Sequence, residues 1–145
     1  MTEDTRREQF LAGHRPDDVL IYLHEEGVRN VDALADHGER TDDGVVLVLP
    51  GERGRQTFQQ ATSLDPMNFA GMAMETPGTV HRDCTSGECP EGSGPDHYVK
   101  FVFAFAEEGG EQAGGIYEEG TVVHAYAACA CGTTYSEKWV AGEKG

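Results

Sequence analysis

Residues 97–105 read HYVKFVFAF, and their alternation is the clearest structural signal in the chain. Successive side chains of a strand point to opposite faces of a sheet, so every second residue shares a face. The residues predicted to lie together on the apolar face are Val99, Phe101, Phe103 and Phe105. This pattern predicts a half-buried strand, which is typical of an antiparallel sheet with one face covered.

Further strands are predicted downstream, over residues 116–117, 121–131 and 133–140. In the last of them, Tyr135 and Trp139 have the same parity and are expected on one face. The preceding residues, 81–96, are rich in Gly, Pro, Ser, Asp and Cys and are predicted to form a loop.

The N-terminal half is predicted to contain one buried strand, because residues 45–49 read VVLVL. A helix is predicted over residues 53–63, and it ends before Asp65-Pro66, since the residue preceding a proline disfavours helical geometry. Residues 67–74 are predicted to be extended. For their apolar side chains we favour core packing over an adaptable interaction surface; these are Met67, Phe69, Met72 and Met74.

Two short helices are predicted earlier in the chain, over residues 16–27 and 27–38. Pro16 suits a first helical position and Gly27 suits a helix end. Residues 19–23 also have a high β-propensity, so a strand is the alternative there.

Together these patterns predict an α+β protein. Residues 1–75 form a part with helices and a buried strand, and residues 76–145 form a part with an antiparallel sheet and a ribbon-like site of four cysteines. The two parts are expected to share one core.

The strongest chemical signal is a set of four cysteines, namely Cys84, Cys89, Cys129 and Cys131. They form a Cys-x4-Cys pair and a Cys-x-Cys pair, which the predicted strands bring together. In an extended segment, Cys129 and Cys131 point the same way with Cα atoms about 6.6 Å apart. That spacing strains a disulfide but lets two thiolates converge on one metal ion. We therefore predict a zinc site formed by these four residues.

Two histidines are alternative ligands for this site. His81 precedes Cys84 with His-x2-Cys spacing, and His97 begins the alternating strand. His124 has the opposite parity from Cys129 and is excluded. Free structural thiols and disulfides remain open alternatives, whereas an iron–sulfur cluster is disfavoured because no Cys-x2-Cys follows the Cys-x4-Cys pair.

Around Cys131-Gly132 the chain resembles zinc ribbons, in which a Cys-Gly pair makes the tight turn after the second ligand of a knuckle. The resemblance covers residues 81–140 and implies two ligand-bearing turns at one end of an antiparallel sheet. The spacings of this chain depart from the Cys-x2-Cys that ribbons use in both knuckles.

The composition is strongly acidic, with 26 Asp and Glu against 11 Lys and Arg and a net charge of −15. Acidic residues spread over both ends, together with few Lys and Ile, make the chain similar to small haloarchaeal protein families of unknown function. Such a charge speaks against nucleic-acid binding, which needs a basic footprint. No apolar run reaches membrane-spanning length and no secretory signal is present, so a cytoplasmic protein is expected.

The sequence therefore favours a non-enzymatic zinc-binding protein of a halophile that acts through a protein partner. One alternative is a metal- or thiol-dependent enzyme, which needs an open coordination position or a reactive thiol. Another is a small-anion binder at Arg53, Gly54 and Arg55, where a strand gives way to the N-terminus of a helix.

Overall fold

The computed structural model describes residues 6–12, 17–26, 38–41, 44–81, 84–92, 94, 97–107 and 121–140. The helices are α1 (Arg6–Leu11), α3 (Gly51–Thr62) and α4 (Pro66–Ala73). The strands are β1 (Asp18–His24), β2 (Glu39–Arg40), β3 (Gly44–Pro50), β4 (Thr79–Val80), β5 (Gly87–Glu88), β6 (Val99–Glu107), β7 (Val122–Cys129) and β8 (Thr134–Val140).

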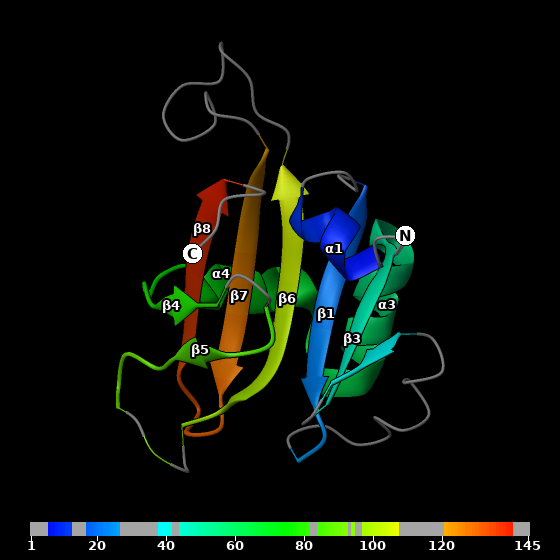
Figure 1. The fold of residues 1–145 in the computed structure, drawn as a ribbon. Coiled ribbons are helices and arrows are strands. Elements are labelled where there is room, and N and C mark those ends of the chain that lie inside the picture. Colours follow the sequence, from blue (N-terminus) through cyan, green and yellow to red (C-terminus); the bar gives the residue numbers. More distant parts are fainter. Residues whose placement is uncertain are drawn as a thin grey trace.

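Six strands form one sheet in the order β2-β3-β1-β6-β7-β8, and every neighbouring pair is antiparallel. Strands β4 and β5 form a separate antiparallel hairpin. Figure 1 shows α3 and α4 on one face of the large sheet, and α1 with the β4–β5 hairpin on the other. The chain is thus an α+β protein built around a central antiparallel sheet, as predicted.

Each face of the sheet has its own apolar cluster. Under the helices α3 and α4, Phe58 and Phe69 pack on Phe101 and Phe103, with ring centroids 5.2 to 5.5 Å apart. The opposite cluster holds Phe10, Val80, Val102, Tyr135 and Trp139, among others. A sheet covered on both faces explains why the central strands read as continuous apolar runs.

The prediction of a half-buried strand over residues 97–105 is wrong in two respects. Val102 is fully buried on the second face, so β6 is covered on both sides. The register of β6 against β7 also shifts between Val99 and Phe101. This β-bulge turns Val99 to the face that carries Val102, away from Phe101 and Phe103.

The helix predicted over residues 16–27 is also wrong, because β1 occupies residues 18–24. This strand pairs with β3 along one edge and with β6 along the other. All five residues 19–23 are buried. Two hydrogen-bonded edges and two covered faces outweigh the helix signals at Pro16 and Gly27, and the alternative strand over residues 19–23 is confirmed.

Residues 67–73 are helical rather than extended, and Met74 is the C-cap of that helix. The Asp65 carboxylate accepts a hydrogen bond from the Asn68 amide at 3.0 Å, and Pro66 occupies the first helical turn. These are the caps of an α-helix N-terminus. Phe69 is buried as predicted, but Met67, Met72 and Met74 are exposed, so core packing is wrong for these methionines.

Other predicted elements are confirmed. The run at residues 45–49 lies within the buried strand β3, and the helix predicted over residues 53–63 is α3. The apolar face of β8 carries Tyr135 and Trp139. The helix predicted over residues 27–38 and the strand over residues 116–117 fall on parts outside the described residues.

Both apolar clusters combine residues from before and after position 75. The division of the chain at that position stays a prediction. Among the described helices, none has the length and apolar composition needed to cross a membrane.

Candidate metal centre

Four metal-ligating side chains meet at the end of the sheet where β7 turns into β8, at the bottom of Figure 1. Cys89 directly follows β5, and His97 lies two residues before β6. Cys129 is the last residue of β7, and Cys131 lies in the turn that leads to β8. Segments far apart in the chain thus supply one cluster.

Two separations within this cluster are close to those between the ligands of a tetrahedral metal site. The Cys89 and Cys131 Sγ atoms are 3.8 Å apart, and the Cys129 Sγ lies 3.7 Å from the His97 Nδ1. All four ligand atoms lie within 4.8 Å of one another. Zn–S bonds of about 2.3 Å and Zn–N bonds of about 2.0 Å place tetrahedral ligands roughly 3.5 to 3.8 Å apart. These residues therefore fit a metal ion with little rearrangement.

The β7–β8 turn places two of the ligands. The Gly132 amide donates to the Cys129 carbonyl at 2.9 Å, and Gly132 adopts a φ of +101°. A residue with a Cβ is strained in that conformation, so glycine permits the tight turn here, as predicted. Cys131 consequently lies in a turn, and the prediction that Cys129 and Cys131 share an extended segment is wrong.

The β4–β5 hairpin places the third ligand by docking on Tyr135. A Cβ at Gly78 would lie 2.5 Å from the Tyr135 ring, and one at Gly87 would lie 2.7 Å from its hydroxyl oxygen. Glycine at both positions therefore lets the hairpin lie flat on the buried Tyr135 ring. Cys89 directly follows β5, so this position of the hairpin places Cys89 in the cluster.

His97 is the fourth potential ligand, and its ring lies near Gly92. A Cβ at Gly92 would lie 3.2 Å from the His97 Nε2 atom. The opposite ring nitrogen, Nδ1, lies 3.7 Å from the Cys129 Sγ. This orientation leaves Nδ1 as the nitrogen that faces the thiols.

The Cys129 and Cys131 thiols differ in their pKa. The Thr133 hydroxyl, 3.4 Å from the Cys131 Sγ, and the Thr133 backbone amide lower the pKa of Cys131 to about 6. Burial raises the pKa of Cys129 to about 11. Cys131 is also the exposed member of the cluster, so it presents a thiolate to an arriving metal ion at neutral pH.

The structure brings together three of the four predicted cysteines and replaces Cys84 by His97. Within the described part of the chain, Cys84 and His81 are not members of the cluster. Cys84 lies in the loop between β4 and β5, where its amide donates to the His81 carbonyl at 2.8 Å and its side chain is buried in the core. The His81 ring instead lies against the Ser86 hydroxyl. None of the four cysteines forms a disulfide.

The turn between β3 and α3 carries the predicted anion site. Gly54 is buried because α3 packs closely on β1 there; a Cβ on it would lie 2.0 Å from Val19. Arg53 and Arg55 are exposed on either side. The Gly51 amide donates to the Asp17 carbonyl at 3.0 Å, so this helix amide already has a partner. Anion binding by Arg53, Gly54 and Arg55 stays a prediction.

Thr133 and Tyr135 were missed as residues that shape the cluster. Thr133 comes two residues after Cys131, and in a turn a hydroxyl at this spacing can reach the earlier side chain. This spacing is a weak sequence signal for the contact. Tyr135 affects the cluster indirectly, because the hairpin that carries Cys89 packs on it at Gly78 and Gly87. No pattern in the sequence indicates this packing.

Comparison with known proteins gives a family but no relative of known activity. No curated protein and no solved structure matches the chain. A family model described as "Family of unknown function (DUF5807)" matches residues 38–142, which include the whole cluster and most of the sheet. The chain therefore belongs to the DUF5807 family, a family of unknown function.

Proposed function

We propose that this protein binds one zinc ion through Cys89, His97, Cys129 and Cys131 and uses it to stabilise its fold. The observation that carries the proposal is the convergence of three thiols and one imidazole within 4.8 Å. A set of three cysteines and one histidine is typical of structural zinc sites, and thiolates favour zinc over magnesium or calcium.

A closed site of this kind favours a non-enzymatic role. Four protein ligands fill the tetrahedral shell, so no position is left for a reactive water molecule. The ion instead ties the segment between β5 and β6 to the β7–β8 turn. Loops anchored in this way keep their shape without further secondary structure.

Because a non-enzymatic protein works by binding other molecules, we propose that this protein acts through a protein partner. Helix α4 and its C-cap support this idea, since Met67, Met72 and Met74 are 52%, 51% and 64% exposed. These are the large apolar side chains that lie exposed in the described part of the chain. Flexible methionine side chains adapt to different partner surfaces, so α4 is the face we propose for docking.

Metal analysis of paired variants tests the zinc site. We expect about one zinc per chain in the wild type, measured by elemental mass spectrometry. His97→Ala is expected to lower zinc affinity by about 100-fold or more, because it removes a ligand. Cys84→Ala serves as the matched control, since it removes a thiol outside the cluster and should leave one zinc bound. A wild type without metal and with four reactive thiols, or a loss of zinc in Cys84→Ala alone, would contradict the proposed site.

We also propose that the protein works in a salty environment, on the basis of its net charge of −15. Self-repulsion of this charge is weak at molar salt, where the Debye length falls to about 3 Å, and stronger at 0.1 M, where it is about 10 Å. We expect Tm to fall by about 5 °C between these conditions, corresponding to one or two kcal/mol. Differential scanning calorimetry in NaCl and in choline chloride measures this. Equal Tm values at both salt concentrations would refute the proposal, and a difference seen with only one salt would indicate specific ion binding instead.

A further inference from the structure

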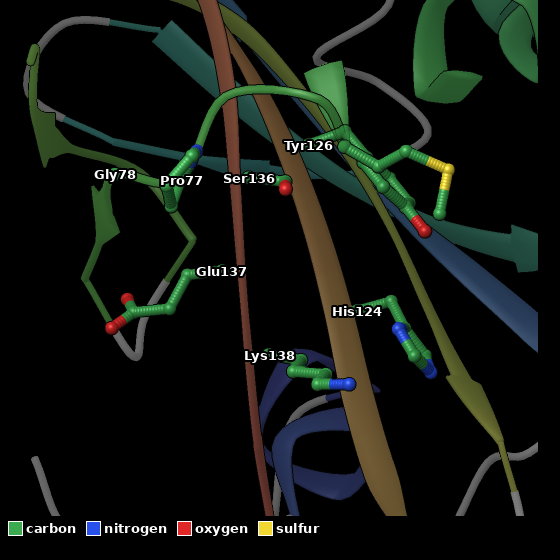
Figure 2. A pocket seen from close by; sticks show the side chains of 8 residues that line it. Pro77, Gly78, His124, Tyr126, Ser136, Glu137 and Lys138 are labelled. Atoms are coloured by element: carbon green, nitrogen blue, oxygen red, sulfur yellow. The ribbon is translucent and has the colours of Figure 1, made fainter. Parts of the chain in front are cut away.

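A cavity of about 450 Å³ lies on the helix-covered face of the sheet, beside the end of α4. Its floor consists of two directly opposed pairs of residues on β7 and β8. One pair is His124 and Lys138, and the other is Tyr126 and Ser136. Figure 2 shows these four side chains around the hollow, with Lys138 extending toward His124.

The remaining walls are mainly apolar. Met74 at the end of α4 lines one side, and Pro77 and Gly78 line the outer edge. The edge is held in place because the Gly78 amide donates to the Ser136 carbonyl at 3.0 Å. Beside the floor, on the neighbouring strand β6, the Phe105 ring stacks on His124 with centroids 5.0 Å apart. The cavity therefore joins a polar end at Lys138 to an apolar end at Met74.

The polar end brings two basic groups together in a protein of strongly negative charge. Burial lowers the pKa of His124 and the charge of Lys138 lowers it further, while the Glu107 carboxylate, 3.4 Å from Nε2, acts in the opposite direction. The lowered pKa leaves the His124 imidazole largely neutral at pH 7, so Lys138 carries the positive charge of this end. A bound anion would act on His124 as the Glu107 carboxylate does and favour its protonated form.

The acidic residue that lines the cavity is turned away from this end. The Glu137 carboxylate accepts a hydrogen bond from the Val80 amide at 2.8 Å, on the β4 side of β8. Figure 2 shows its side chain pointing away from both His124 and Lys138. Its negative charge is therefore partly satisfied by β4 and is directed away from the basic pair.

We propose that this cavity binds a small organic anion. Its carboxylate or phosphate group lies between Lys138 and His124, and its apolar part packs on Tyr126 and Met74. The cavity volume falls in the range of small-molecule sites, about 300 to 1,000 Å³. The site is separate from the zinc cluster, so this proposal does not depend on the proposed function.

Titration of the ¹⁵N-labelled protein, purified with its metal, tests the site by NMR at constant ionic strength. The probes are benzoate, phenyl phosphate and the neutral benzyl alcohol. We expect at least one of the two anions to cause saturable shifts at His124, Tyr126 and Ser136. Tighter binding of benzoate identifies a carboxylate ligand, and tighter binding of phenyl phosphate identifies a phosphate ligand.

Two lysine variants make the test specific. Lys138→Gln is expected to weaken anion binding about tenfold or more, the effect of losing one charge-assisted hydrogen bond. Lys138 is exposed, so the variant should remain folded. Lys100→Gln removes the same charge from β6 and should bind the anion as the wild type does. The proposal is overturned if neither anion saturates, if benzyl alcohol binds as tightly as the anions, or if both lysine variants weaken binding equally.

Discussion

Cys131→Ser is expected to abolish stoichiometric zinc binding and to lower Tm by about 10 °C. A site whose metal concentration is a thousandfold above its Kd stabilises the folded state by about 4 kcal/mol. For a domain of this size each kcal/mol corresponds to roughly 2 to 4 °C. Zinc-finger peptides depend on the metal for about 10 kcal/mol or more because they lack another core. Here the two apolar clusters remain, so a smaller loss is expected.

The exposure of Cys131 makes this variant informative. An exposed side chain contributes no core packing, so any large loss of stability must come from the metal. The control is the same substitution in protein stripped of zinc by a chelator, where we expect Tm values of variant and wild type to agree within about 1 °C. Differential scanning calorimetry measures both pairs. A Tm that is unchanged in the metal-loaded protein, or an equal fall in both states, would show that Cys131 is not a ligand.

Phe58→Ala is expected to destabilise the protein by about 3 to 5 kcal/mol without affecting zinc binding. The Phe58 side chain is fully buried between α4 and the sheet. Its ring lies 5.5 Å from Phe69, 5.5 Å from Phe101 and 5.2 Å from Phe103, measured between centroids. Truncation leaves a cavity that these three rings cannot fill without moving. The corresponding fall in Tm is about 10 °C.

Phe58→Leu provides the matched control, because it keeps an apolar side chain of moderate volume in the same place. We expect it to cost less than half as much as Phe58→Ala, as measured by urea denaturation. Zinc content of both variants should stay at the wild-type level, since the cluster lies at the end of the sheet, away from α3. A loss below 1 kcal/mol in Phe58→Ala would show that α3 does not pack on the sheet as the structure has it.

Alternation and turn residues predicted much of the sheet. The strands β6, β7 and β8 follow from local patterns of apolar residues, and so do the buried strand β3 and the helix α3 that comes after it. The region around Asp18–His24 was predicted incorrectly because its flanking Pro16 and Gly27 resemble helix ends. Its strand conformation depends on pairing with β3 and β6, which are distant in the sequence.

The candidate metal site shows the same limit. The Cys-x4-Cys spacing made Cys84 the natural partner of Cys89, and no local signal placed His97 ahead of His81 as a ligand. The β4–β5 hairpin packs on Tyr135, and in this position Cys89 lies near the β7–β8 turn. Cys84, in the loop of the same hairpin, is buried in the core. The His97 ring lies between Gly92 and the thiols, with Nδ1 3.7 Å from the Cys129 Sγ.

By itself, the sequence determined the α+β class, the strands around the cysteines and the presence of metal-ligating residues. These properties depend on side-chain periodicity and residue chemistry, which are local. Only the tertiary structure decided which side chains share the site, which methionines are exposed and where a basic pair meets a cavity. Those outcomes depend on the register of distant strands and on contacts at single glycines, where a shift of one residue sends a side chain to the opposite face.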